Sequence, residues 1–185
     1  MAIEEAAFNL IEKNKPFEIR DYAPYILAEV VVEGSLTSAG NSAFSVLFDY
    51  ISGSNQSRNK ITMTTPVSQE IAGEKIKMTT PVEQKAVEGK WAVSFMMPAT
   101  YTMETLPKPT NPAITLRSIA TRRMAVIRYS GFWSEKNYLQ HKAELVSWII
   151  SKGFVMVGEP VWARYNPPFT PWFLRRNEIL IPIEH

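Results

Sequence analysis

Residues 17–34, FEIRDYAPYILAEVVVEG, carry the pattern from which the fold can be worked out. FEIRDY begins with alternating apolar and polar residues, and ILAEVVVEG is rich in β-branched residues and ends at Gly34. Both features are typical of β-strands. Residues 8–13 also alternate, and the NKP that follows supplies a turn, so a hairpin is expected to open the sheet. A helix over residues 3–13 is the alternative interpretation.

Two helices are predicted from apolar residues at helical spacing. The first is expected over residues 39–51, with Gly53 in the place of a left-handed C-cap. The second is expected over residues 134–152, with Ser134 as its N-cap. Each helix carries one apolar stripe expected to face the core: Phe44, Leu47, Phe48 and Ile51 in the first, and Tyr138, His141, Leu145, Trp148 and Ile149 in the second.

The second half of the chain repeats the first in the order of its elements. A shift of 97 residues places Gly34 on Gly131, and in both halves two strands, a glycine turn and a helix follow one another. We therefore predict a duplicated β-β-α-β unit in an α+β fold. The repeats are expected at about residues 8–105 and 113–183, within a single domain over residues 1–185.

A shorter repeat lies between the predicted helices. KITMTTPV at 60–67 recurs as KIKMTTPV at 75–82, and each copy reads as a strand that a proline ends. Further strands are expected at residues 90–97 and 114–119. Four apolar residues of the two copies would share one surface, either as a core layer or as an adaptable wall for an apolar ligand: Ile61, Met63, Ile76 and Met78.

Composition excludes several kinds of chemistry. The chain of 185 residues has no cysteine and two histidines, so disulfides, thiolate metal sites and multi-histidine metal centres are excluded. Its net charge of +2 is too small to drive nucleic-acid binding. There is no run of 18 apolar residues and no basic, apolar leader, so we expect a soluble cytoplasmic protein without a membrane span.

Four separated segments together resemble the SOUL haem-binding protein family: FEIRDYAPY (17–25), the two MTTPV blocks, ARYNPP (163–168) and RRNEILI (175–181). The resemblance runs from about residue 8 to residue 183. It implies a distorted antiparallel β-barrel with two flanking helices and a tetrapyrrole, haem, as the ligand. The fold is also similar to the effector-binding domains of some bacterial transcription regulators.

The resemblance implies two ways of binding haem. In one branch of the family a histidine after Ile-Arg ligates the iron, and here that position is Asp21, a poor haem ligand. His141 is the internal imidazole, and it reads either as a core-edge residue or as an iron ligand. We therefore predict tetrapyrrole binding without an axial histidine, with haem as the candidate cofactor and no metal site of the chain's own.

A second branch of the family binds tetrapyrrole in an apolar cleft along the first helix. The apolar residues of that cleft are matched here, but its basic residues, which meet the propionates, are replaced by Asn41, Asp49 and Thr170. Loss of charge-assisted hydrogen bonds weakens such binding. The residues implied for this cleft are Asn41, Phe44, Leu47, Phe48 and Thr170.

The regulator-like fold implies an alternative site around Glu178. A buried glutamate beside aromatic rings attracts cationic hydrophobic molecules, or acts as a general acid if burial raises its pKa. The chain would then be an effector-sensing module or a small-molecule hydrolase, although no catalytic residue is assigned, and an interaction module without a small ligand is a third interpretation. The residues of this alternative site are Tyr129, Tyr165, Trp172 and Glu178.

Overall fold

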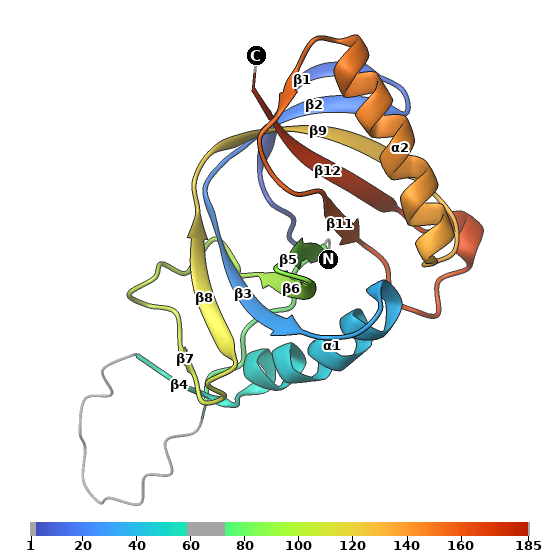
Figure 1. Cartoon of the computed structure of the whole chain (residues 1–185). Coiled ribbons are helices and arrows are strands. Elements are labelled where there is room, and N and C mark those ends of the chain that lie inside the picture. The colour runs from blue at the N-terminus through green and yellow to red at the C-terminus, as the bar shows by residue number, and fades with distance from the viewer. Residues whose placement is uncertain (1–2, 59–72, 185) are drawn as a thin grey trace, which may run out of the picture.

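A large antiparallel sheet with two helices packed against it makes up the computed structural model, which describes residues 3–58 and 73–184 (Figure 1). The predicted α+β class is therefore confirmed. Within these residues no helix is both long and apolar enough to cross a membrane.

The two halves contribute matching elements. The first half forms β1 (Phe8–Asn14), β2 (Phe17–Tyr22), β3 (Tyr25–Val32), α1 (Leu36–Ser52), β4 (Asn55–Gln56), β5 (Val82–Val87), β6 (Lys90–Met96) and β7 (Lys108–Pro109). The second half forms β8 (Ile114–Ile119), β9 (Arg122–Tyr129), α2 (Glu135–Ser151), β10 (Val155–Met156), β11 (Val161–Arg164), the 3-10 turn η1 (Trp172–Leu174) and β12 (Asn177–Glu184).

Strand order reflects the repeat. β8 and β9 begin and end 97 residues after β2 and β3. The sheet runs β1-β2-β9-β12-β11-β5-β6-β3-β8, so that, leaving β1 aside, each strand and its counterpart stand at the same distance from the centre. β2 and β3 of the first half correspond to β8 and β9 of the second, and they pair across the halves, β2 with β9 and β3 with β8. The two halves therefore share one sheet, joined in the middle by β5 and β11.

Helix ends follow the capping residues. α1 begins three residues before its predicted start because Ser35 caps it. The Ser35 side chain accepts a hydrogen bond from the Ser38 N–H, and the Ser38 side chain accepts one from the Ser35 N–H. The helix ends before Gly53, whose φ of 129° suits glycine, as predicted. α2 begins after its predicted N-cap, Ser134. The hairpin at the start of the chain is confirmed by the antiparallel pairing of β1 with β2.

Two expectations about strands need correction. Among the described residues, β1 and β8 are the ends of the main sheet and do not pair with each other, so the expected barrel stays open. The second MTTPV copy is not a strand before Val82, because its backbone serves other partners: the Ile76 N–H donates to Ile51 and the Thr80 N–H to Glu4. Ile76 is buried and Met78 exposed, and the first copy lies outside the described residues.

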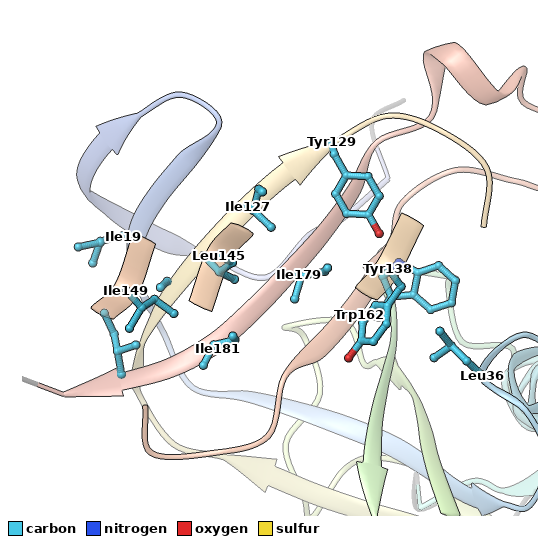
Figure 2. Packing of buried hydrophobic residues seen from close by; sticks show 12 residues of the cluster. Ile19, Leu36, Ile127, Tyr129, Tyr138, Leu145, Ile149, Trp162, Ile179 and Ile181 are labelled. Atoms are coloured by element: carbon cyan, nitrogen blue, oxygen red, sulfur yellow. The ribbon is translucent and has the colours of Figure 1, made fainter. Parts of the chain in front are cut away.

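Both helices cover the same face of the sheet, which we call the helix-covered face. α1 packs on β3 and β6, and α2 packs on β9 and β12. Trp162 of β11 is buried on this face between Leu36 at the start of α1 and Tyr138 of α2 (Figure 2). On the other side, which we call the opposite face, a smaller apolar cluster surrounds Met124, Val126 and Leu180.

Candidate ligand-binding site

Phe44 and Phe48 form an exposed aromatic pair on α1. Their rings stack with centroids 5.9 Å apart, and Phe44 also makes an edge contact with the buried Phe95 of β6. The stripe pattern predicts that both rings face the core, but they are 38% and 45% exposed. Leu47 and Ile51 of the same stripe are buried beneath the helix, so they do not line an outer surface. The two phenylalanines therefore occupy the flank of α1.

This flank of α1 faces the middle of the sheet. Gly40, one turn before Phe44, lies directly over Arg164 of β11, where an added Cβ would come within 2.5 Å of the Nη2 atom. Strand register aligns Arg164 with Val82 of β5, and Val82 with Phe95 of β6, in one row on the helix-covered face. The row passes beneath the side of α1 that carries Phe44. In this row Phe95 is buried, and Val82 and Arg164 are half-buried.

A stack of cations and rings extends this surface toward the second half of the chain. The guanidinium of Arg164 lies 5.5 Å from the ring centroid of Trp133, and that of Arg175 lies 4.3 Å from the same ring. Arg175 in turn donates from Nε to the carbonyl of Thr170 at 2.9 Å. The stack therefore runs from Arg164 through Trp133 to Arg175. Asn41, which follows Gly40, is near its Arg164 end, and Thr170 is at its Arg175 end. We call Phe44, Phe48, Phe95, Trp133 and Arg164 the central strip.

Asp49 belongs to a different surface of α1. It lines an open hollow of about 430 Å³ together with Val46, Tyr50 and residues 110–112, which precede β8. β8 lies beyond β3, at the end of the sheet. The carboxylate of Asp49 therefore faces away from the middle of the sheet.

The central strip has two of the properties that a flat acidic ligand such as haem requires. Phe44 and Phe48 offer stacked rings that remain exposed. Arg164 offers a guanidinium that no carboxylate of the described residues pairs with, and its burial lowers its pKa to about 10, so that it remains charged at neutral pH. Arg164 therefore supplies a basic group on β11, which a comparison of positions 41 and 49 of the first helix with the family does not reveal.

Glu178 is the centre of a buried ion network on the opposite face. Arg20 donates from Nη1 and Nη2 to its two oxygens at 2.8 and 3.0 Å, Arg176 donates at 3.0 Å and the Tyr165 hydroxyl at 2.8 Å. Burial alone would raise the pKa of Glu178, but the hydrogen bonds and charges of the two arginines outweigh it and lower that pKa. General acid chemistry would need a raised pKa, whereas the pKa of Glu178 is lowered.

The four residues of the alternative site do not come together. Tyr165 and Glu178 are hydrogen-bonded on the opposite face, whereas Tyr129 packs in the core cluster of the helix-covered face. Trp172 is 49% exposed on the 3-10 turn, where it stacks on Phe132. The sheet separates Tyr129 from Glu178 because successive side chains of a strand point to opposite faces.

Asp21, at the position of the family histidine, is bound to Arg123. Nε and Nη2 of that arginine donate to its two oxygens at 2.7 and 2.8 Å, and the hydrogen bonds of Arg123 lower the pKa of Asp21. Both oxygens are therefore engaged in a bidentate pair across β2 and β9. The position does not fit an iron ligand.

His141 is held in one orientation on α2. Its Nδ1–H donates to the carbonyl of Asn137 at 2.7 Å, and its ring stacks on Tyr129 with centroids 3.9 Å apart.

Replacing His141 with alanine is therefore expected to leave the Soret band of added hemin unchanged. Absorbance spectra of wild type and variant measure this. A shifted or weakened band in the variant would instead assign iron ligation to His141.

One half-buried carboxyl, that of Glu83, is not found by the sequence-based reasoning. Glu83 of β5 lies on the opposite face, where the Tyr25 hydroxyl donates to its Oε1 at 3.2 Å and Arg122 contacts the same hydroxyl. Burial raises the pKa of Glu83, and the charge of Arg122 opposes that rise only in part. In the sequence, Glu83 and Lys85 alternate with neutral residues as they do on a solvent-facing strand. The half-buried position of Glu83 becomes visible only when β5 is paired with β11.

The described residues contain no group of three His, Asp or Glu side chains that could hold a metal ion.

The strand arrangement is similar to that of the EcmrR C-terminal domain, with a TM-score of 0.63, 10% identity and coverage of 91% of this chain and 96% of that one. It is also similar to a hydrolase from Listeria innocua, with a TM-score of 0.59, 11% identity and 91% of each chain covered. At such identities these likenesses show the fold alone.

Comparison with families is more specific. No curated protein matches the chain. The model of the family described as SOUL heme-binding protein matches residues 3–182, nearly the whole length. That span includes both helices, the central strip and the Glu178 network, so the chain belongs to the SOUL heme-binding protein family.

Proposed function

We propose that the chain binds a flat, hydrophobic small molecule of the tetrapyrrole class on the central strip, without an axial histidine. The observation that supports this most is the exposed pair Phe44 and Phe48, which stacks on the flank of a helix whose neighbouring apolar residues are buried. Exposed aromatic rings that face the middle of a sheet offer a flat apolar surface, which suits a conjugated macrocycle.

Haem would contribute a flat conjugated ring and two propionate groups at this site. Phe44 and Phe48 would contact the ring, and Trp133 and Arg164 lie on the side where acidic groups would be accepted. The carboxylate of Glu178 is occupied by four hydrogen bonds on the opposite face. We therefore place the ligand on the helix-covered face.

Titration with hemin and with protoporphyrin IX tests the proposal. Saturable quenching of tryptophan fluorescence is expected, because Trp133 lies in the strip. Replacing Phe44 and Phe48 together with aspartate is expected to lower affinity by about two orders of magnitude, since stacking is lost and two carboxylates face an acidic ligand.

The matched control places the same two carboxylates on the other helix. Leu139 and Ile150 of α2 are exposed, and their replacement with aspartate is expected to leave affinity within about twofold of wild type, because neither residue belongs to the central strip. Unchanged affinity in the Phe44→Asp, Phe48→Asp double variant, or equal losses in both double variants, would exclude the central strip as the binding surface.

A further inference from the structure

Unpaired hydrogen-bond donors gather beneath the central strip. Four buried side-chain atoms of the described residues have no hydrogen-bond partner in the protein. Three of these lie on the helix-covered face: the Tyr129 hydroxyl, the Trp162 Nε1 and the Arg164 Nε. The indole and guanidinium nitrogens can only donate, and the hydroxyl can donate as well. Buried donors without acceptors are costly, so their clustering needs an explanation.

The three groups are close neighbours. Trp162 and Arg164 alternate along β11, and the guanidinium of Arg164 lies 4.7 Å from the indole centroid. Register aligns Arg164 with Asn177 of β12, and Asn177 with Tyr129 of β9, in one row. The Tyr129 hydroxyl points toward Trp162 (Figure 2). Burial raises the pKa of this hydroxyl, and the nearby indole N–H, which does not reach hydrogen-bonding geometry, opposes the rise only in part.

Within residues 3–58 and 73–184, no carboxylate balances the charge of Arg164. Its Nη2 donates to the amide oxygen of Gln84 at 3.2 Å, and no acidic side chain of the described residues pairs with it. Arg20, by contrast, is 2% exposed and is matched by Glu178 and Glu18. Buried charges in proteins are generally paired. Among the described residues, Arg164 therefore lacks the acidic partner that a buried charge generally has.

We propose that Arg164, Trp162 and Tyr129 form a receptor for one carboxylate group of the bound ligand. This rests on the proposed function and narrows it: the ligand would be a hydrophobic acid rather than a hydrophobic cation or a neutral molecule. Three donors around one positive charge match the acceptor capacity of a carboxylate. Gly40 permits the approach of α1 over the guanidinium, because any side chain there would meet Nη2.

The first experiment compares protoporphyrin IX with its dimethyl ester at the same detergent concentration. Wild type is expected to bind the diacid at least tenfold more tightly than the diester. Arg164→Gln is expected to lose about tenfold in affinity for the diacid and to retain its affinity for the diester, and Arg164→Lys to recover part of the loss. Arg128→Gln, a change of an exposed arginine on β9, serves as the matched control and is expected to bind both as wild type does.

The second experiment uses benzoate and does not depend on porphyrin binding. Its readout is the indole N–H signal of Trp162 in NMR spectra of ¹⁵N-labelled protein. We expect benzoate to shift this signal in wild type and in the Phe44→Asp, Phe48→Asp variant, but not in Arg164→Gln. A thermal melt of each variant confirms that it is folded.

The outcomes separate the two proposals. If benzoate shifts the Trp162 signal through Arg164 while no porphyrin binds, the receptor stands and the tetrapyrrole proposal fails. If porphyrins bind but Arg164→Gln weakens diacid and diester equally, or neither, the receptor is overturned. A Trp162 signal that benzoate leaves unmoved in wild type also overturns it, since the unpaired donors would then be met by water.

Discussion

Replacing Glu178 with glutamine is expected to lower the free energy of unfolding by about 3–5 kcal/mol. Glu178 is fully buried, and Arg20, which is 2% exposed, directs two hydrogen bonds to it. Glutamine keeps the shape of the side chain but removes the charge, so Arg20 and Arg176 lose their shared counter-charge. Urea unfolding followed by circular dichroism measures the difference.

The matched control is Asp21, which follows Arg20, the partner of Glu178, on β2. Asp21 pairs with Arg123 in the same bidentate geometry, but these side chains are 28% and 38% exposed, so Asp21→Asn is expected to cost no more than about 1 kcal/mol. Equal costs for the two variants would show that burial does not strengthen the Glu178 network. Removing Glu178 and Arg20 together is expected to cost less than the sum of the single changes, because the residues are directly coupled.

The pH dependence of the Glu178 variant has a definite sign. The folded pKa of Glu178 lies below its ordinary value of 4.5, so the stability that its ionised form contributes is present above that value. This contribution is lost as the pH falls through the folded pKa. The stability gap between wild type and Glu178→Gln should therefore narrow below about pH 4.5. A gap that widens on acidification would contradict the assigned direction.

How far the sequence predicts the fold depends on the range of each interaction. β2, β3, β8 and β9 are readable because alternation and β-branched content are local properties, and the shift of 97 residues reproduces their limits. The centre of the sheet is not readable in this way. β11 has only four residues, and its pairing with β5 joins residues such as Val82 and Arg164 that are far apart in the chain.

The candidate site is less predictable than the fold, for a related reason. Apolar spacing shows that Phe44, Leu47 and Phe48 share one side of a helix, but not that a neighbouring strand covers Leu47 and leaves the two rings exposed. Arg164 sits in ARYNPP, a segment that reads as a strand end followed by a turn. Its burial without an acidic partner depends on the positions of α1 and Trp133. Only the assembled sheet reveals it.

Replacing Trp162 with alanine is expected to cost about 3–5 kcal/mol of stability. The indole is 1% exposed and packs between Tyr138 of α2, with ring centroids 5.7 Å apart, and Leu36 of α1 (Figure 2). Its loss would leave a cavity between the two helices. Trp172→Ala is the matched control, since that indole is half-exposed, and it is expected to change stability by less than about 1 kcal/mol. Similar losses in both variants would refute the central role of Trp162.

A phenylalanine at position 162 separates packing from hydrogen bonding. Trp162→Phe retains most of the buried ring but lacks the indole N–H. Because this N–H has no hydrogen-bond partner in the described part of the chain, the replacement removes no hydrogen bond seen there. Its stability cost should therefore fall well below that of Trp162→Ala. If the indole N–H serves the proposed carboxylate receptor, Trp162→Phe should nevertheless weaken binding of the porphyrin diacid more than that of the diester. Stability and ligand selectivity would then depend on different atoms of one side chain.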